Sequence, residues 1–262
     1  MSNIENKEKL YNSFVIYIPA YNAALTLPKV FERIPVSLRN YCKEILVIDN
    51  CSADNTSEVT LSYKQKPGFE KIRLIRNEKN LGYGGSQKLA YSECIKNECK
   101  GVIMLHGDAQ YAPELAEMLL EPIICDEADM VFGSRMTGSP LAGGMPIHRY
   151  LGNRFLTKIQ NLLLNTNISE FHSGYRVFSL NALKKVPFYK LSSDYHFDTE
   201  ILILFLHNNL RIVERPIPTH YGDEECYVNI WKYGLDVLVS TITYYLHKKK
   251  IRYSERWAIR LN

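Results

Sequence analysis

The sequence lacks any apolar run long enough to cross a bilayer, and its six cysteines form no CxxC pair. The most apolar stretch near the end, Val237 to Leu246, falls well short of the roughly 20 residues that a membrane-spanning helix needs. The polar start, Met1 to Glu8, is unlike a signal peptide. We therefore expect no membrane span and a protein of the reducing cytoplasm.

A strong charge imbalance is also missing. Lys and Arg number 32 against 28 for Asp and Glu, so nothing favours nucleic acid as a partner. The segment from His247 to Arg252 is nevertheless strongly basic. With 262 residues, 46% of them hydrophobic, the chain can build the core of one large α/β domain or two small ones.

Short β-branched runs alternate with helical patterns along the chain. We expect strands at residues 14–18, 45–48, 72–75, 102–105, 130–132, 175–179 and 211–217. We expect helices at residues 27–34, 56–64, 85–95, 113–123, 147–164, 197–207 and 228–246. This rhythm predicts a mainly parallel sheet with helices on both faces, and a binding site where the strands end.

One expected strand runs directly into possible metal ligands, in the segment VIMLHGDAQY. If the chain stays extended beyond Leu105, residues two apart share a face, so that His106, Asp108 and Gln110 point at one cation. Mg²⁺ or Mn²⁺ there would shield a diphosphate while a glycosidic bond breaks. A turn satisfied by its own hydrogen bonds is the alternative. His106 stays open as a ligand; if it binds the metal, Mn²⁺ gains over Mg²⁺.

Three other features suit a phosphorylated ligand. Asp49 ends the second strand, where an acid can hold a ribose hydroxyl or a base N–H, or cap a turn. Residues 80–86 (NLGYGGS) offer backbone N–H groups before a helix, or form an ordinary glycine turn. Several arginines could converge on a diphosphate or a phosphate acceptor, although each alone fits a solvated helix face. They are Arg135, Arg149, Arg154 and Arg176.

In chain order, the segments PAYN, VIDNCSADNT, NLGYGGS, HGDAQY, GSR, HSGYR and FDTE resemble the family 2 glycosyltransferases of the GT-A fold. They are most similar to the dolichol- and polyprenyl-phosphate mannosyl- and glucosyltransferases, over roughly residues 14–238. The resemblance implies a Rossmann-like α/β fold with a mainly parallel mixed sheet flanked by helices. It also implies inverting transfer from a nucleotide-diphosphate sugar to a polyprenyl phosphate, which is already an anion and needs no general base.

The resemblance further implies roles for individual residues. The nucleotide-sugar site comprises Pro19, Tyr21, Asn22, Asp49, Asn50, Gly82, Gly84 and Asp108. The site for Mg²⁺ or Mn²⁺ comprises Asp108 and Gln110, with His106 open. The acceptor and its phosphate fall to Arg149, Asn153, Arg154, Ser173 and Arg176, and the catalytic set is Asp108, Arg135, Arg149 and Glu170.

Three residues depart from the pattern of these families. Asn50 replaces the usual second acid after Asp49, His106 replaces the first acid of Asp-x-Asp, and Glu170 stands in place of an Asp. Glu170 could act as a base if the acceptor were a saccharide hydroxyl in capsule, O-antigen or other envelope glycan synthesis. A third alternative, a nucleotide-sugar-binding protein without catalysis, is suggested by Asn50 and His106.

We expect a flexible N-terminus at residues 1–12, a catalytic domain at 13–226 and a C-terminal helix with a basic tail at 227–262. Within the catalytic domain, residues 13–111 would bind the nucleotide and residues 112–226 would face the acceptor, with a mobile loop at 136–147. The last helix and its basic end could lie on an anionic membrane surface, at the inner face, or pack as a core or homodimer helix.

Overall fold

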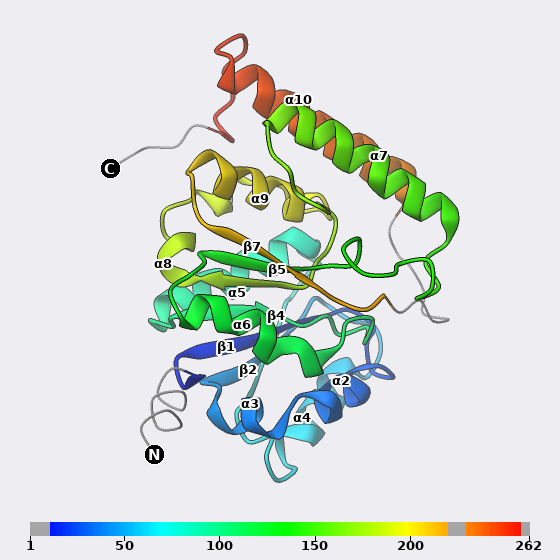
Figure 1. The fold of residues 1–262 in the computed structure, drawn as a ribbon. Coiled ribbons are helices and arrows are strands. Elements are labelled where there is room, and N and C mark those ends of the chain that lie inside the picture. The colour runs from blue at the N-terminus through cyan, green and yellow to red at the C-terminus, as the bar shows by residue number, and fades with distance from the viewer. Residues whose placement is uncertain (1–10, 220–228, 258–262) are drawn as a thin grey trace.

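The computed structural model describes residues 11–219 and 229–257, arranged around one mixed sheet (Figure 1). The sheet has seven strands in the order β3-β2-β1-β4-β6-β5-β7. They are β1 (Phe14–Ala20), β2 (Glu44–Asp49), β3 (Ile72–Arg76), β4 (Gly101–Met104), β5 (Met130–Ser134), β6 (Arg176–Ser179) and β7 (Ile212–Pro216). All seven expected strands are confirmed, with ends shifted by at most two residues.

The sheet is mainly parallel, as expected, with one reversed strand. Strands β1 to β4 run parallel to one another, and β5 pairs in parallel with β7. Strand β6 lies antiparallel between β4 and β5. Because β6 runs backwards, the segment that precedes it lies at the same edge as the carboxyl ends of the other strands. That edge therefore collects the chain after β1, β2, β4 and β5 together with residues 170–175.

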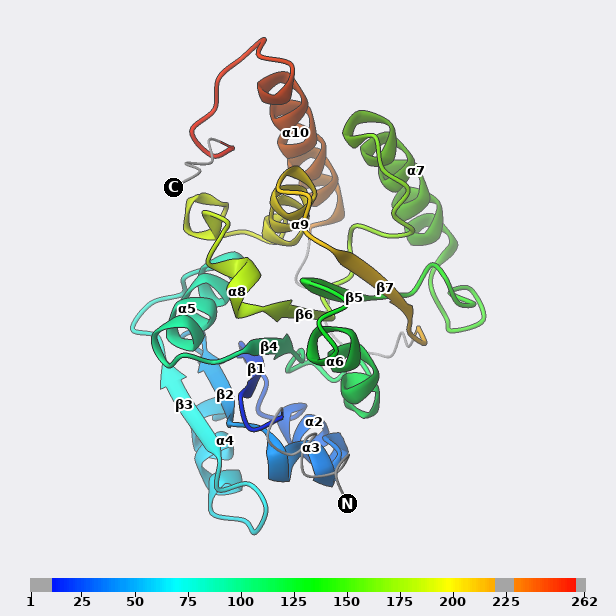
Figure 2. The ribbon, with the colours of Figure 1, turned by 60° about the vertical axis from the view of Figure 1, so that its left-hand side comes forward.

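Helices cover both faces of the sheet (Figure 2). Side chains alternate along each strand, so Val15 and Tyr17 of β1 enter one core while Ile16 and Ile18 enter the other. The first core is covered by α5 (Tyr83–Lys96), α8 (Leu180–Leu183) and α9 (Phe197–His207). The second is covered by α2 (Leu27–Arg33), α3 (Val36–Tyr41), α4 (Thr56–Lys64) and α6 (Ala116–Ile124).

Two long helices form a separate layer beyond β5 and β7. α7 (Ile147–Leu164) and α10 (Ile230–Lys248) lie side by side, and α10 also packs on α9 (Figure 1). The segment before α7 has no helix or strand at residues 135–146, and Ile147, the last residue of the expected loop, begins α7. Among the described residues, no helix combines the length and apolarity that a membrane span requires.

The sequence missed only short elements. α3, α8 and the 3-10 helix η2 (Phe188–Lys190) were not expected, and the helix expected at residues 113–123 begins as the 3-10 helix η1 (Pro113–Leu115) before it continues as α6. The flexible N-terminus expected at residues 1–12 falls almost wholly outside the described residues, as do the end of the basic tail and the junction at residues 226–227. The domain boundaries stay predictions.

Candidate active site

A cavity of about 960 Å³ opens at the carboxyl edge of the sheet. Its walls come from the chain after β1, β2, β4 and β5, from the segment before β6, and from α5, α7, α9 and α10. It brings together most of the residues that the sequence singled out. These are Pro19, Tyr21, Asn22, Asn50, Gly82, His106, Asp108, Gln110, Arg135, Arg149 and Asn153.

The segment from His106 to Gln110, which holds the expected metal ligands, reaches this cavity by a different path from the one expected. The chain does not stay extended beyond β4: it turns at Gly107 and Asp108, and Ala109 has a left-handed φ of 62°. The alternation argument was therefore wrong, although His106, Asp108 and Gln110 all line the cavity. The backbone N–H of Gln110 donates to Asp108 Oδ1 at 3.0 Å, and Asp108 Oδ2 lies 3.9 Å from His106 Nδ1.

These donors fit a divalent cation that also binds phosphate. The Asp108 side chain is 41% exposed, and its carboxylate lines the cavity. Asp108, the Gln110 amide and the His106 imidazole offer too few ligands to enclose an ion alone. Phosphate oxygens of a bound diphosphate would complete the shell.

His106 is tied to a residue to which the sequence had assigned no role. Its Nε2 lies 3.2 Å from the hydroxyl of Tyr83, which donates to Asp198 Oδ2 at 2.8 Å. Burial, together with the nearby charge of Asp198, raises the pKa of Tyr83 well above its ordinary value. Asp198 lines the cavity and also accepts a bond from Gln87. The available signal was the FDTE segment, in which two carboxylates stand directly before the apolar run ILILFL.

Asn50 organises the part of the cavity where the sequence predicted a nucleotide. Its amide donates to Asn80 Oδ1 at 2.8 Å and accepts from the backbone N–H of Leu81 at 2.9 Å and from Asn77 at 3.0 Å. An aspartate has no donor for Asn80, so the replacement of the usual acid gives this loop a brace that an acid cannot supply. Tyr21, which is 42% exposed, lines the same cavity.

Asp49 and Gly84 do not line the cavity, in contrast to expectation. The buried Asp49 carboxylate accepts from the backbone N–H of Ser52 at 2.8 Å and from the hydroxyl of Ser57, which shapes the loop after β2. A Cβ at Gly84 would lie 2.6 Å from the carbonyl oxygen of Ser192, so this glycine allows α5 to pack closely. Both residues therefore shape the backbone around the cavity without lining it.

Only two of the four arginines line the cavity. Arg135 and Arg149 do so, from the ends of β5 and the first turn of α7. Arg154 lies on the exposed side of α7, with its guanidinium 5.6 Å from the ring centre of Tyr150. Arg176 is fully buried, and it donates to the carbonyl oxygens of three residues, Phe171, Ser173 and Asp198. Ser173 itself is buried outside the cavity lining. The structure therefore does not bring Arg154, Ser173 and Arg176 into the cavity with the other expected acceptor residues.

Glu170 is buried behind Arg135. It accepts from the Arg135 backbone N–H at 2.8 Å, from the Arg135 guanidinium Nε at 3.0 Å and from Asn153 at 2.9 Å. Burial alone would raise the pKa of Glu170, but the Arg135 charge and these hydrogen bonds outweigh it, so the pKa is lowered. A fully covered carboxylate bound to an arginine is poorly suited to be the base that the sequence suggested. It positions Arg135 and Asn153.

A neutral histidine faces the cavity beside Arg135. Burial lowers the pKa of His172 to about 4, and its Nδ1 lies 2.9 Å from the hydroxyl of Tyr233 on α10. Both residues line the cavity, and the sequence had assigned a role to neither. His172 stood in the HSGYR segment, but Tyr233 follows a region without any motif.

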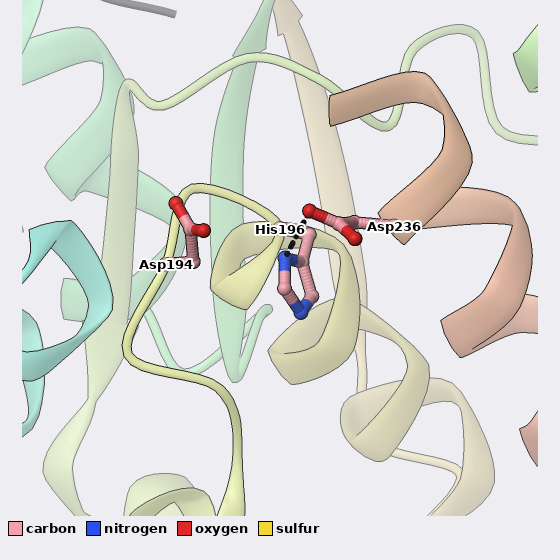
Figure 3. A group of neighbouring side chains, drawn as sticks. All are labelled: Asp194, His196 and Asp236. Atoms are coloured by element: carbon pink, nitrogen blue, oxygen red, sulfur yellow. Dashed lines mark ion pairs between the residues drawn. The ribbon is translucent and has the colours of Figure 1, made fainter. Parts of the chain in front are cut away.

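A second group of possible metal ligands lies at the rim of the cavity, where Figure 3 shows Asp194, His196 and Asp236 together. Their ligand atoms lie within 4.8 Å of one another. However, the ammonium of Lys232 donates to both carboxylates, at 3.0 Å in the case of Asp236. Lys232 therefore offsets one of the two carboxylate charges, and the group joins the loop before α9 to α10.

Comparison with known proteins decides the family. The model of Glycosyl transferase family 2 matches residues 15–187. The chain belongs to this family. The expected glycosyltransferase identity is thus confirmed, and the matched range includes the cavity residues after β1, β2, β4 and β5 and the segment before β6.

Two relatives of this family 2 glycosyltransferase carry informative names. Over 219 residues it is 28% identical to the UDP-N-acetylglucosamine–dolichyl-phosphate N-acetylglucosaminyltransferase of Methanococcus voltae, covering 79% of this chain and 86% of that one. Over 206 residues it is 22% identical to the polyprenol monophosphomannose synthase of Mycolicibacterium smegmatis, covering 78% and 76%.

The fold also has solved counterparts. Glucosyl-3-phosphoglycerate synthase of Mycobacterium tuberculosis, in complex with Mn²⁺, UDP and phosphoglyceric acid, superposes with a TM-score of 0.69 at 13% identity, covering 91% of this chain and 80% of that one. The expected GT-A fold is confirmed by this likeness.

Proposed function

We propose that this family 2 glycosyltransferase moves a sugar from a nucleotide-diphosphate donor to a polyprenyl phosphate, with Mg²⁺ or Mn²⁺ at Asp108. The observation that carries the proposal is the cavity, where the metal segment, the nucleotide-side loops and two arginines face one space. The two relatives named for dolichyl and polyprenol phosphates support the lipid acceptor.

The donor would lie along the carboxyl ends of β1, β2 and β4. Its nucleoside would meet Tyr21 and Asn50, and its diphosphate would lie beside Asp108 and Gln110. A cation bound there would neutralise the charge that develops on the departing nucleoside diphosphate. Asp108 and Gln110 would hold and orient the cation, since both reach the cavity from one turn.

The acceptor phosphate would lie opposite, near Arg135 and Arg149. Glu170 accepts hydrogen bonds from the backbone N–H and the guanidinium of Arg135, and these bonds fix the position of the Arg135 side chain. A phosphate acceptor is ionised at neutral pH and needs only positioning and charge stabilisation. Transfer to a saccharide hydroxyl would need a base in the cavity, and the burial of Glu170 makes it unsuited to that role.

An outer apolar surface on α7 and α10 adjoins the same cavity. It consists of the exposed side chains Ile147, Leu151, Phe155 and Leu162 of α7, with Ile230, Trp231, Leu235, Val239 and Ile242 of α10. The two helices also line the cavity, through Arg149 and Tyr233 among others. Exposed Lys248–Lys250 end α10 and would attract anionic lipid by about 1 kcal/mol each. A membrane-held prenyl chain would thus meet this surface while its phosphate enters the cavity.

Labelled UDP-, GDP-, dTDP- and CDP-sugars, offered with Mn²⁺ and undecaprenyl or dolichyl phosphate, test the proposal. We expect one donor to yield label that is extractable into organic solvent and that disappears with a chelator. Label recovered only on a saccharide would contradict the lipid acceptor. Donor binding by calorimetry without transfer to any acceptor would instead support a non-catalytic binding protein.

A further inference from the structure

We propose that His106 binds the divalent cation through Nδ1, and that Tyr83 and Asp198 hold its imidazole in the tautomer that leaves this nitrogen unprotonated. The inference rests on the cation site of the proposed function. It adds one ligand and names two positioning residues, neither of which touches the cation.

The tautomer follows from counting protons. Tyr83 has a single hydroxyl proton, and it donates this proton to Asp198 Oδ2 at 2.8 Å. A carboxylate can only accept, and the Arg176 guanidinium, which donates to the Asp198 carbonyl oxygen, places positive charge beside it. The Tyr83 oxygen can therefore only accept from His106 Nε2, 3.2 Å away. Nε2 carries the proton, and Nδ1 keeps its lone pair.

The free nitrogen points toward the metal segment. His106 Nδ1 lies 3.9 Å from Asp108 Oδ2, which is too far for a hydrogen bond but leaves both atoms available to one ion. The other Asp108 oxygen is occupied by the backbone N–H of Gln110. A histidine ligand whose second nitrogen donates to a partner that is itself hydrogen-bonded is the usual arrangement at protein metal sites.

Gly174 makes room for this arrangement. A Cβ on Gly174 would lie 2.5 Å from His106 Nε2 and 2.9 Å from the Tyr83 hydroxyl, so no larger residue is compatible with the bond between them. The backbone N–H of Gly174 donates to the hydroxyl of Tyr111, whose ring packs edge-on against the imidazole, with centroids 4.9 Å apart. Four separate motifs, NLGYGGS, HGDAQY, HSGYR and FDTE, thus converge on one imidazole.

Electron spin echo spectroscopy of the Mn²⁺-loaded protein tests the ligand directly, without substrate and with or without inorganic pyrophosphate. We expect modulation from a directly bound imidazole nitrogen, shifted when histidine is ¹⁵N-labelled, and lost in His106→Phe. His196→Gln is the control, since it alters the other candidate metal group and should keep the signal. Absence of nitrogen coupling in the parent protein, or its loss in His196→Gln instead, would overturn the inference.

Tyr83→Phe tests the positioning role. We expect its Kd for Mn²⁺ to rise about 10- to 100-fold, the usual effect of removing a hydrogen-bond partner of a ligand. Tyr233→Phe is the matched control, because it removes a hydroxyl from the other cavity imidazole, that of His172, and should leave the Kd unchanged. Free Mn²⁺ is read by its electron paramagnetic resonance signal, and thermal unfolding verifies that each variant is folded. An unchanged Kd in Tyr83→Phe would remove Tyr83 and Asp198 from the account.

His106→Asp tests the chemical consequence of a nitrogen ligand. An imidazole favours Mn²⁺ over Mg²⁺, whereas carboxylate oxygen suits both. We expect the ratio of Mg²⁺ to Mn²⁺ dissociation constants to fall at least several-fold in this variant; an unchanged ratio would contradict the inference. All three measurements report metal binding alone. Nitrogen coupling without sugar transfer would refute the proposed function and leave this inference standing. Sugar transfer without nitrogen coupling would refute this inference and leave the proposed function standing.

Discussion

Asp108 is the residue whose loss should reveal the chemistry. Asp108→Asn removes the negative charge that would hold the cation, while its partial exposure spares the fold. We expect the rate of sugar transfer in a single-turnover assay to fall by about 100-fold or more. Glu114→Gln, which changes an exposed carboxylate paired with Arg33 outside the cavity, is the control and should keep the rate. Equal rates in the two variants would contradict the assignment of the metal to Asp108.

His172 should make folding sensitive to mild acid. Its pKa of about 4 lies below the ordinary value near 6.5, so between these values the unfolded chain binds a proton that the folded chain does not. Stability therefore falls as pH falls through this window, by up to about 3 kcal/mol from this one group. Urea unfolding of parent and His172→Gln at pH 7 and pH 4.5 measures the effect. The variant should lose less stability than the parent; parallel losses would place the effect elsewhere.

The sequence predicted the cavity residues that directly follow strand ends, because parallel strands bring their carboxyl ends to one edge whatever the loop geometry. This is why Tyr21, Asp108 and Arg135 were found. It could not separate Arg149 from Arg176, since Asp198, whose carbonyl oxygen binds Arg176, comes from a segment that meets it only in the folded chain. Charge and residue type were visible in the sequence, but the partners were not.

At the scale of elements, α5 depends on a glycine that the sequence assigned to the ligand. A Cβ at Gly84 would meet Ser192 O at 2.6 Å and Phe197 Cβ at 2.7 Å. We expect Gly84→Ala to lower the free energy of unfolding by about 1–3 kcal/mol through overpacking. Gly152→Ala is the matched control on α7, where a Cβ meets nothing within 4 Å, and it should raise stability by up to about 1 kcal/mol. Urea unfolding measures both, and stabilisation by both substitutions would contradict the packing argument.

The outer apolar surface of α7 and α10 carries a built-in reporter. Trp231 is 90% exposed, whereas the second tryptophan, Trp257, is 1% exposed. We expect anionic vesicles to shift the emission of Trp231 to shorter wavelength as its ring leaves water. Leu235→Glu should weaken vesicle binding, and Leu61→Glu, on α4, should not. If vesicles leave the emission of Trp231 unchanged and sedimentation detects a dimer, the homodimer alternative is favoured.

The direction of β6 illustrates what a pattern of apolar residues omits. Alternation and β-branched residues predicted a strand at residues 175–179, and the strand is present. Nothing in its side chains distinguishes parallel from antiparallel pairing, because both place alternate residues on opposite faces. The turn at Gly107 was missed for a similar reason, since a short polar segment can continue a strand or end it with equal ease.

For the whole molecule, binding of donor and metal should appear as stabilisation. A ligand that binds only the folded chain adds about 2.7 kcal/mol when its concentration is 100 times its Kd. For a chain of 262 residues we expect the unfolding midpoint to rise by several degrees with one nucleotide sugar plus Mn²⁺, and by less without the metal. A thermal-shift screen of UDP-, GDP-, dTDP- and CDP-sugars measures this and identifies the base. Equal shifts with and without Mn²⁺ would argue against a metal-bridged diphosphate.

The family match ends at residue 187, but residues beyond it also line the cavity. Asp194, Tyr195 and Asp198 close one side of it, and Ile230 and Tyr233 of α10 close another. Arg135 and Arg149, on the proposed acceptor side, lie before residue 187, whereas Asp198, which is hydrogen-bonded to Tyr83 beside His106, lies after it. We therefore expect that chimaeras which take only the stretch after β6 from a relative disturb metal binding, and that the molecule receiving the sugar is exchanged only when α7 is grafted together with that stretch.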